Sequence, residues 1–270
     1  MRKLHSPLVY VVTAVMLLPI IWMAATSFKP PMEYVSTSVA LLPDAPTLAH
    51  YQELLGRDDV AGKILNSLVV TLGAAALSLA VGFPAAYALV RMQLPKRLDA
   101  GFLMFVLLVK LAPPLVLAIP LYQVLRSVNL LDTHAGLIFV YQVYTLPFAI
   151  WMLIGFVRDV SPSYEEAAMM DGAGLLRRLL TIVLPIMAPG IAATLVLLII
   201  ISWNEFAYAM LFIQTPSKFT LPTFIATLIT EDETFWGRLT AIGLIASVPI
   251  LFILAFFQKY LVRGLAGGLK

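Results

Sequence analysis

Charged side chains divide this chain into long apolar segments. Four runs contain no Asp, Glu, Lys or Arg, and they cover residues 4–28, 64–90, 133–157 and 239–258. Two further runs, 100–125 and 179–217, carry one charge each, Lys110 and Glu205. A helix needs about 20 apolar residues to cross a hydrocarbon core of roughly 30 Å. The pattern therefore predicts a single all-α membrane domain, 1–270, with six transmembrane helices at roughly 8–28, 67–90, 101–125, 135–157, 186–213 and 239–260.

The composition agrees with a membrane protein and excludes several classes of function. Of the 270 residues, 61% are hydrophobic and 12% are charged, against roughly 25% charged in soluble domains. The chain has no cysteine and only three isolated histidines, so we expect no disulfide, no metal site and no thiol enzyme. The longest segment between predicted helices, about 38 residues, is too short for a nucleotide-binding domain. Any hydrolysis of ATP must come from a partner, and we expect no catalytic residues.

Basic residues predict the orientation of the helices, because cytoplasmic segments of membrane proteins are enriched in Lys and Arg. With the N-terminus inside, eleven basic residues fall on the cytoplasmic side and six on the opposite side. We therefore expect both termini in the cytoplasm. The net charge of +3 reflects this topology, since no basic stripe interleaved with aromatic residues indicates nucleic-acid binding.

Prolines inside several predicted helices, among them Pro113, Pro147 and Pro249, serve either helix packing or a solute path.

The segment 161–185, SPSYEEAAMMDGAGLLRRLLTIVLP, combines helix-start and helix-stop signals in a predicted cytoplasmic loop. Ser161 or Ser163 can cap a helix, and Pro162 suits its first turn. Gly172 ends the helix after about ten residues and favours a left-handed backbone there. Such a short helix is marginal alone, so other contacts must hold it. From these residues alone the segment is either an ordinary interfacial loop or a helix that contacts a partner.

The same segment resembles the EAA loop of binding-protein-dependent ATP-binding cassette (ABC) importers. The matching positions, at full spacing, are Glu166, Ala167, Ala168, Gly172 and 182–185. Four further stretches are similar, less specifically, to the carbohydrate-importing, maltose-type group. They are AAYALVR at 85–91, PLYQVLRSVNLLD at 120–132, SWNEF at 202–206 and VRGLAGGLK at 262–270. The resemblance implies a permease subunit with the type I ABC importer fold, located in a bacterial inner membrane.

The resemblance also implies the partners. They are a second permease subunit that completes a heterodimer, two copies of an ATPase subunit that bind ATP and Mg, an extracytoplasmic solute-binding protein and a sugar-like substrate. No cofactor is expected in this chain. In that family the EAA helix contacts the ATPase and couples ATP-driven closure to the transmembrane helices. The residues that the resemblance assigns to coupling are Glu165, Glu166, Ala167, Ala168, Asp171 and Gly172.

The residues expected along the translocation path are Lys110, Trp203, Asn204 and Glu205. A charge at a helix centre costs about 2.5–3.5 kcal/mol on insertion scales, so Lys110 and Glu205 should face the bundle or a cavity. The motif at 203–205 resembles one that recurs in the fifth helix of the family, where an aromatic ring and polar groups would suit a sugar. Alternatively, Asn204 and Glu205 brace neighbouring helices. Lys110 would serve a sugar hydroxyl or an anionic substituent.

These observations predict the permease subunit of an ATP-driven importer for a sugar or sugar derivative. An alternative is an ABC permease for a non-sugar or anionic solute, such as a phosphate or sulfonate ester. A stand-alone secondary transporter is a third possibility. It would need intramembrane acids arranged as a proton relay, for which one Lys and one Glu offer little support.

Overall fold

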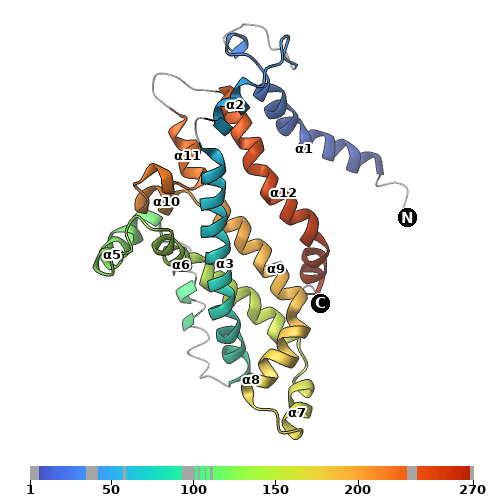
Figure 1. The fold of residues 1–270 in the computed structure, drawn as a ribbon. Coiled ribbons are helices and arrows are strands. Elements are labelled where there is room, and N and C mark those ends of the chain that lie inside the picture. Colours follow the sequence, from blue (N-terminus) through green and yellow to red (C-terminus); the bar gives the residue numbers. More distant parts are fainter. Residues whose placement is uncertain are drawn as a thin grey trace.

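The computed structural model describes residues 6–34, 42–56, 59–92, 101–102, 104–106, 108–109, 112–229 and 236–267. The elements of this part are helices (Figure 1). They are α1 (Ser6–Ser27), η1 (Pro31–Tyr34), α2 (Ala49–Gly56), α3 (Val60–Arg91), α5 (Pro114–Ser127), α6 (His134–Asp159), α7 (Pro162–Met170), α8 (Leu175–Arg178), the π-helix η2 (Leu179–Val183), α9 (Leu184–Trp203), α10 (Ala207–Phe212), η3 (Pro216–Lys218), α11 (Leu221–Thr227) and α12 (Trp236–Gly267).

Five helices of the described part are long and apolar enough to cross a membrane. They are Val9–Ser27, Val60–Arg91, His134–Asp159, Leu175–Trp203 and Trp236–Gln258. Each of these helices overlaps one of the six segments that the sequence predicts, and the bounds differ most for Leu175–Trp203, where the prediction is 186–213. The sixth, at 101–125, falls partly on residues outside the described part, and Lys110 is one of them. The crossing at 101–125 therefore stays a prediction; α5 covers its second half, beginning directly after Pro113.

The core is formed where α3 packs against α6 and α9, and α12 lies against α9 and α1. Small residues allow this close packing, as is common between transmembrane helices. A Cβ atom at Gly190 of α9 would lie 2.5 Å from the ring of Phe156 on α6. Between α3 and α6, the Ser78 hydroxyl lies 2.7 Å from both Gln142 Oε1 and Thr145 Oγ1. These polar contacts satisfy buried side chains inside an otherwise apolar bundle.

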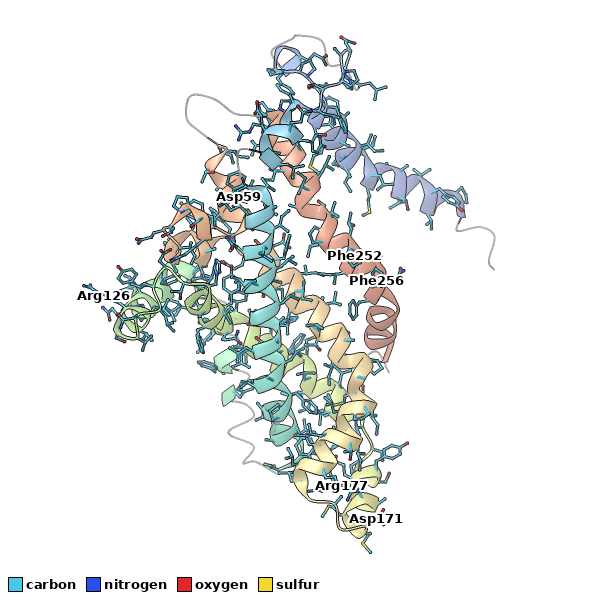
Figure 2. All side chains as sticks on the ribbon, viewed as in Figure 1. Asp59, Arg126, Asp171, Arg177, Phe252 and Phe256 are labelled. Atoms are coloured by element: carbon cyan, nitrogen blue, oxygen red, sulfur yellow. The ribbon has the colours of Figure 1, made fainter. Side chains whose placement is uncertain are left out.

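Figure 1 shows α7 and α8 at one end of the molecule and α2 at the opposite end. The segments that follow the first and fourth predicted helices therefore lie far apart, as segments on opposite sides of a membrane must. Between these ends, α1 presents large apolar side chains outward, for example Tyr10 and Met16. Figure 2 shows Phe252 and Phe256 on α12, and both are exposed in this single chain. Exposed apolar helix faces of this kind suit lipid or a second membrane subunit.

The helix predicted at 186–213 is divided in the structure. α9 ends at Trp203, residues 204–206 are not helical, and α10 begins at Ala207. The Asn204 amide donates to the carbonyl of Ile200 at 2.8 Å, and such bonds from an Asn side chain compete with helix continuation. The division places a polar break inside an apolar run, and the break contains the predicted path residues Asn204 and Glu205.

A second polar network connects the turn before α6 with the segment after α10. Asp132 accepts hydrogen bonds from the amides of Gln214 and Thr215 and from the Thr215 hydroxyl. Lys218 Nζ lies 3.2 Å from the Asp132 carboxylate. Desolvation raises the pKa of Asp132, but these bonds outweigh it, so the pKa lies well below its ordinary value. The carboxylate therefore holds two loops together in its charged form.

We expect Asp132→Asn to lower the unfolding free energy by about 1–2 kcal/mol at pH 7, because the charged acceptor is lost. The folded-state pKa is depressed, so this contribution is present above the unfolded value of about 3.9 and is lost as the pH falls towards the folded value. Thermal unfolding of the purified permease at pH 7 and pH 3 checks this, with the difference between wild type and Asp132→Asn narrowing at pH 3. Asp44→Asn, at an exposed position, is the control and should unfold like wild type at both pH values. An unchanged midpoint for Asp132→Asn at pH 7 would contradict the assignment.

Candidate functional site

α7 begins with the capping residues that the sequence predicts. Ser161 is the N-cap, its side chain accepts from the Ser163 amide, and Pro162 occupies the first turn. The N-cap oxygen satisfies an amide that has no partner inside the helix, and proline has no amide to satisfy. Glu165 lies in the first turn, where the helix dipole favours a negative charge. Local sequence therefore fixes where this short helix starts.

Gly172 forms the turn that ends α7, with φ of +77°. The Gly172 amide donates to the carbonyl of Met169 at 3.0 Å, and the Ala173 amide donates to that of Ala168 at 2.9 Å. This pair of bonds is the Schellman motif, which requires a left-handed residue directly after the helix. The predicted turn at Gly172 is thus confirmed in its position and its backbone conformation.

α7 lies at the tip of the molecule with most of its surface uncovered (Figure 2). Only Glu165 and Ala168 of its nine residues are buried. The predicted coupling residues that are exposed are Glu166, Ala167, Asp171 and Gly172. Large apolar side chains are exposed beside them, most of all Met170 at 88%. In Figure 2, Asp171 and Arg177 mark this tip, which joins charged and apolar groups on one small surface.

Glu165 differs from its neighbours because its carboxylate points into the protein. Its Oε1 accepts from Arg91 Nε at 2.8 Å, and its Oε2 accepts from the hydroxyl of Tyr87. Both partners belong to the last turns of α3. The sequence pattern grouped Glu165 with the residues of the exposed surface, and nothing in it indicated partners 74 and 78 residues away. The structure therefore divides the predicted coupling residues into an exposed group and an anchoring one.

The connection from α7 to the membrane passes through a π-helix. Residues 179–183 adopt this wider form, and the Leu184 amide donates to the carbonyl of Leu179. Pro185 follows and has no amide proton, so the regular bond to residue 181 cannot form. π-Segments are rare and occur often at functional positions. The helix that carries α7 thus enters the membrane through an irregular turn.

The second part of the candidate site is the break between α9 and α10. Trp203 is buried, whereas Asn204 is exposed. Glu205 accepts from the amides of Tyr208 at 2.8 Å and Ala209 at 3.2 Å, which lie in the first turn of α10. The carboxylate therefore supports the start of α10. This contact agrees with a bracing role. The helix that Glu205 supports is α10, which follows it directly in the chain, and not a neighbouring transmembrane helix.

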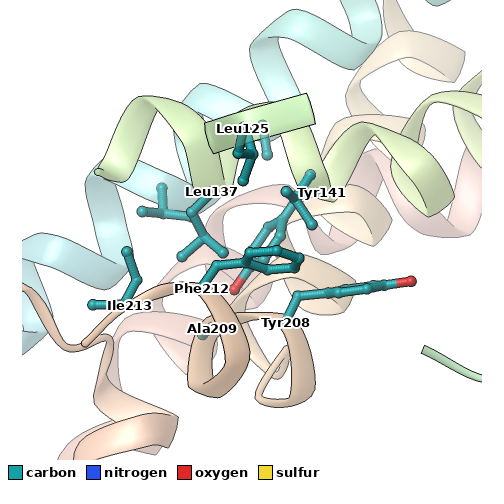
Figure 3. Packing of buried hydrophobic residues seen from close by; sticks show 10 residues of the cluster. Leu125, Leu137, Tyr141, Tyr208, Ala209, Phe212 and Ile213 are labelled. Atoms are coloured by element: carbon teal, nitrogen blue, oxygen red, sulfur yellow. The ribbon is translucent and has the colours of Figure 1, made fainter. Parts of the chain in front are cut away.

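Aromatic rings surround this break, and they were not among the residues predicted from the sequence. Tyr144 of α6 stacks on Tyr208 of α10 with centroids 6.1 Å apart, and Tyr208 contacts Phe212 at 6.2 Å. Figure 3 shows Tyr208 and Phe212 packed beside Tyr141, with the Tyr208 hydroxyl directed away from the cluster. The hydroxyls of Tyr144 and Ser202 are also buried beside this break. The sequence feature that could have indicated this aromatic cluster is the pair Tyr141 and Tyr144, three residues apart in an apolar predicted helix.

Comparison with known proteins identifies the architecture. Residues 78–267 match the family described as binding-protein-dependent transport system inner membrane component. The chain belongs to this family. It is a transport permease and not an enzyme, and it is a multi-pass protein of the inner membrane. Relatives described as ABC transporter permeases match most of the chain at 30–36% identity, so the alternative of a stand-alone secondary transporter is wrong.

Individual relatives cover almost the whole chain. Identity is 33% over 270 residues to the sulfoquinovosyl glycerol transport system permease protein SmoH of Agrobacterium fabrum, which covers 98% of this chain and 94% of that protein. It is 32% over 262 residues to the diacetylchitobiose uptake system permease protein DasC of Streptomyces coelicolor, covering 95% and 94%. A solved structure of a bacterial ABC transporter involved in import of the acidic polysaccharide alginate matches with a TM-score of 0.76, at 23% identity over 96% of this chain and 99% of that one. The last comparison confirms the predicted permease fold.

Proposed function

We propose that this permease imports a sugar or sugar derivative as one of two different membrane subunits. An extracytoplasmic binding protein would deliver the solute, and two copies of an ATPase would hydrolyse ATP with Mg on the cytoplasmic side. This chain would hold neither cofactor. The α7 end would lie in the cytoplasm together with both termini, as the distribution of basic residues predicts.

The observation that carries this proposal is the exposed surface of α7. A nine-residue helix that is capped at both ends is presented at the tip of the molecule, and it leaves Tyr164, Met169 and Met170 uncovered. Exposed apolar groups rimmed by polar ones are typical of protein contact surfaces. Glu166 and Asp171 would provide that rim, Ala167 would allow a close approach, and the Gly172 turn would fix the angle of the helix.

The substrate class rests on the relatives and on the chemistry at the α9–α10 break. The two relatives are named for sulfoquinovosyl glycerol and diacetylchitobiose, which are both sugar derivatives. At this break the exposed Asn204 offers an amide and the half-buried Tyr144 an aromatic ring, and polar groups beside an aromatic ring suit a sugar. Trp203, Asn204 and Glu205 would lie along the path beside them. A sulfonated or otherwise anionic sugar is a second candidate, because the first of these relatives is named for a sulfoquinovosyl compound and Lys110 would supply a cation.

Reconstitution of the complete transporter in vesicles tests the proposal. The complex of both permease subunits, the ATPase and the binding protein should accumulate a labelled neutral disaccharide or an anionic sugar only when ATP is present. Uptake without ATP, or equal uptake without the binding protein, would contradict it. If only the anionic sugar is transported, the second candidate is the substrate class.

A further inference from the structure

One arginine side chain joins the ends of three helices at the α7 end of the molecule. Arg91 is the last residue of α3, and its Nε donates to Glu165 on α7. A terminal guanidinium nitrogen donates to the carbonyls of Val157 at 3.1 Å and Val160 at 2.5 Å, at the end of α6. One guanidinium therefore binds a carboxylate through Nε and two carbonyls of a helix end through a terminal nitrogen.

This junction is largely buried. Glu165 is 5% exposed and Tyr87, its second partner, is 4% exposed. The Arg91 side chain is 17% exposed. Beneath it, Val157, Val160 and other apolar side chains pack in one cluster with Tyr87. Because water screens this ion pair poorly, separating its two charges costs more free energy than separating an exposed pair. The contact is therefore stiffer than an exposed ion pair.

Glu165 is also the main side-chain attachment of α7. Within the described residues, the hydrogen bonds that join an α7 side chain to another long helix are both accepted by this carboxylate. The adjacent Glu166 is exposed, because consecutive residues of a helix do not share a face. α7 thus places one carboxylate inward and one outward, directly next to each other.

We propose that Glu165, with Tyr87 and Arg91, is a positioning site that transmits movement of α7 to α3 and α6. The inference rests on the proposed function, in which α7 contacts the ATPase. A load on α7 reaches the membrane by two routes. One is the covalent chain, which bends at the Gly172 turn and the π-helix; the other is this buried junction, which connects directly to α3. Since α3 packs against both α6 and α9, the junction moves the bundle core, and without it α7 would tilt alone.

The experiment separates transmission from binding. In the reconstituted complex, Glu165→Gln, Tyr87→Phe and Arg91→Lys should each keep the ATPase subunits bound and leave the basal ATPase rate unchanged. Stimulation of ATPase activity by the loaded binding protein should fall about tenfold, within the usual range of a coupling free energy. Glu166→Gln should give the opposite pattern, with weaker retention of the ATPase. Arg158→Gln, which removes an exposed charge at the same end of α6, is the control and should behave like wild type.

An independent readout uses the absence of cysteine in the chain. Met170→Cys at the exposed tip should cross-link to a cysteine on the ATPase with equal yield in the presence or absence of Glu165→Gln. Full stimulation in all three junction variants would overturn the proposal. Equal loss of retention and stimulation would also overturn it, because Glu165 would then only maintain the fold of the surface. If Glu165→Gln does not assemble, Tyr87→Phe decides, since it removes one hydrogen bond and no charge. Absence of stimulation in the wild-type complex would instead refute the proposed function.

Discussion

Replacing Gly172 with valine will reduce ATP-driven uptake by at least about tenfold while the permease still inserts into the membrane, since a loss of 1.4 kcal/mol already gives a factor of ten. The residue has φ of +77°, and a Cβ atom there would meet nothing within 4 Å. The penalty is therefore conformational and not steric contact with a neighbour. A left-handed L-residue costs roughly 1–2 kcal/mol, and more for a β-branched side chain. Valine would open the turn, break the two Schellman bonds and change the angle at which α7 faces its partner.

Gly174 offers a matched control for this prediction. A Cβ atom at Gly174 would also meet nothing within 4 Å, but the φ of this residue is −69°, which any residue adopts. Gly174→Val should therefore transport at close to the wild-type rate. Gly172→Asn should be intermediate, because asparagine tolerates the left-handed region. Uptake and retention of the ATPase on the purified permease measure all three. Normal values for Gly172→Val would show that the angle of α7 does not matter for coupling.

The features of α7 that the sequence predicted are all local. Ser161 and Pro162 act within one turn, and Gly172 acts through its own backbone, so their effects can be derived from neighbouring positions. The inward direction of Glu165 could not be derived in this way. It depends on Arg91 and Tyr87, which reach the same place only because α3 and α6 end at the same level of the bundle. Sequence reasoning thus located the helix and its ends but not its attachment.

The break after Trp203 shows a different limit. Hydropathy is continuous across it, because α10 is as apolar as the end of α9, and an 18-residue or longer apolar run is normally interpreted as one helix. From the sequence, Asn204 and Glu205 are expected to be path or bracing residues on a continuous helix. Their actual effect is on the backbone: Asn204 bonds to the preceding turn and Glu205 to the following one. Only the three-dimensional arrangement shows that α10 then turns to pack Tyr208 on Tyr144.

Glu205→Ala will both destabilise the permease and reduce uptake by about tenfold or more. The substitution removes the acceptor for the amides of Tyr208 and Ala209, and each buried donor left unsatisfied costs about 1–3 kcal/mol. α10 has six residues and cannot persist without such support. Its loss would release Tyr208 and Phe212 from the cluster with Leu137 and Tyr141. Thermal unfolding of the purified permease and uptake by the reconstituted complex should therefore decline together.

Asn204→Ala distinguishes this bracing role from direct contact with solute. The Asn204 side chain is exposed, and among the described residues its hydrogen bond is to Ile200 of α9, so its loss should leave the unfolding midpoint unchanged. If the residue contacts solute, the substrate concentration for half-maximal uptake will rise without any change in stability. Glu205→Gln keeps one acceptor oxygen and should lie between wild type and Glu205→Ala in stability. A Glu205→Ala variant that unfolds like wild type but does not transport would contradict the bracing role, and it would place this carboxylate on the solute path, because the amides of α10 would then not depend on it.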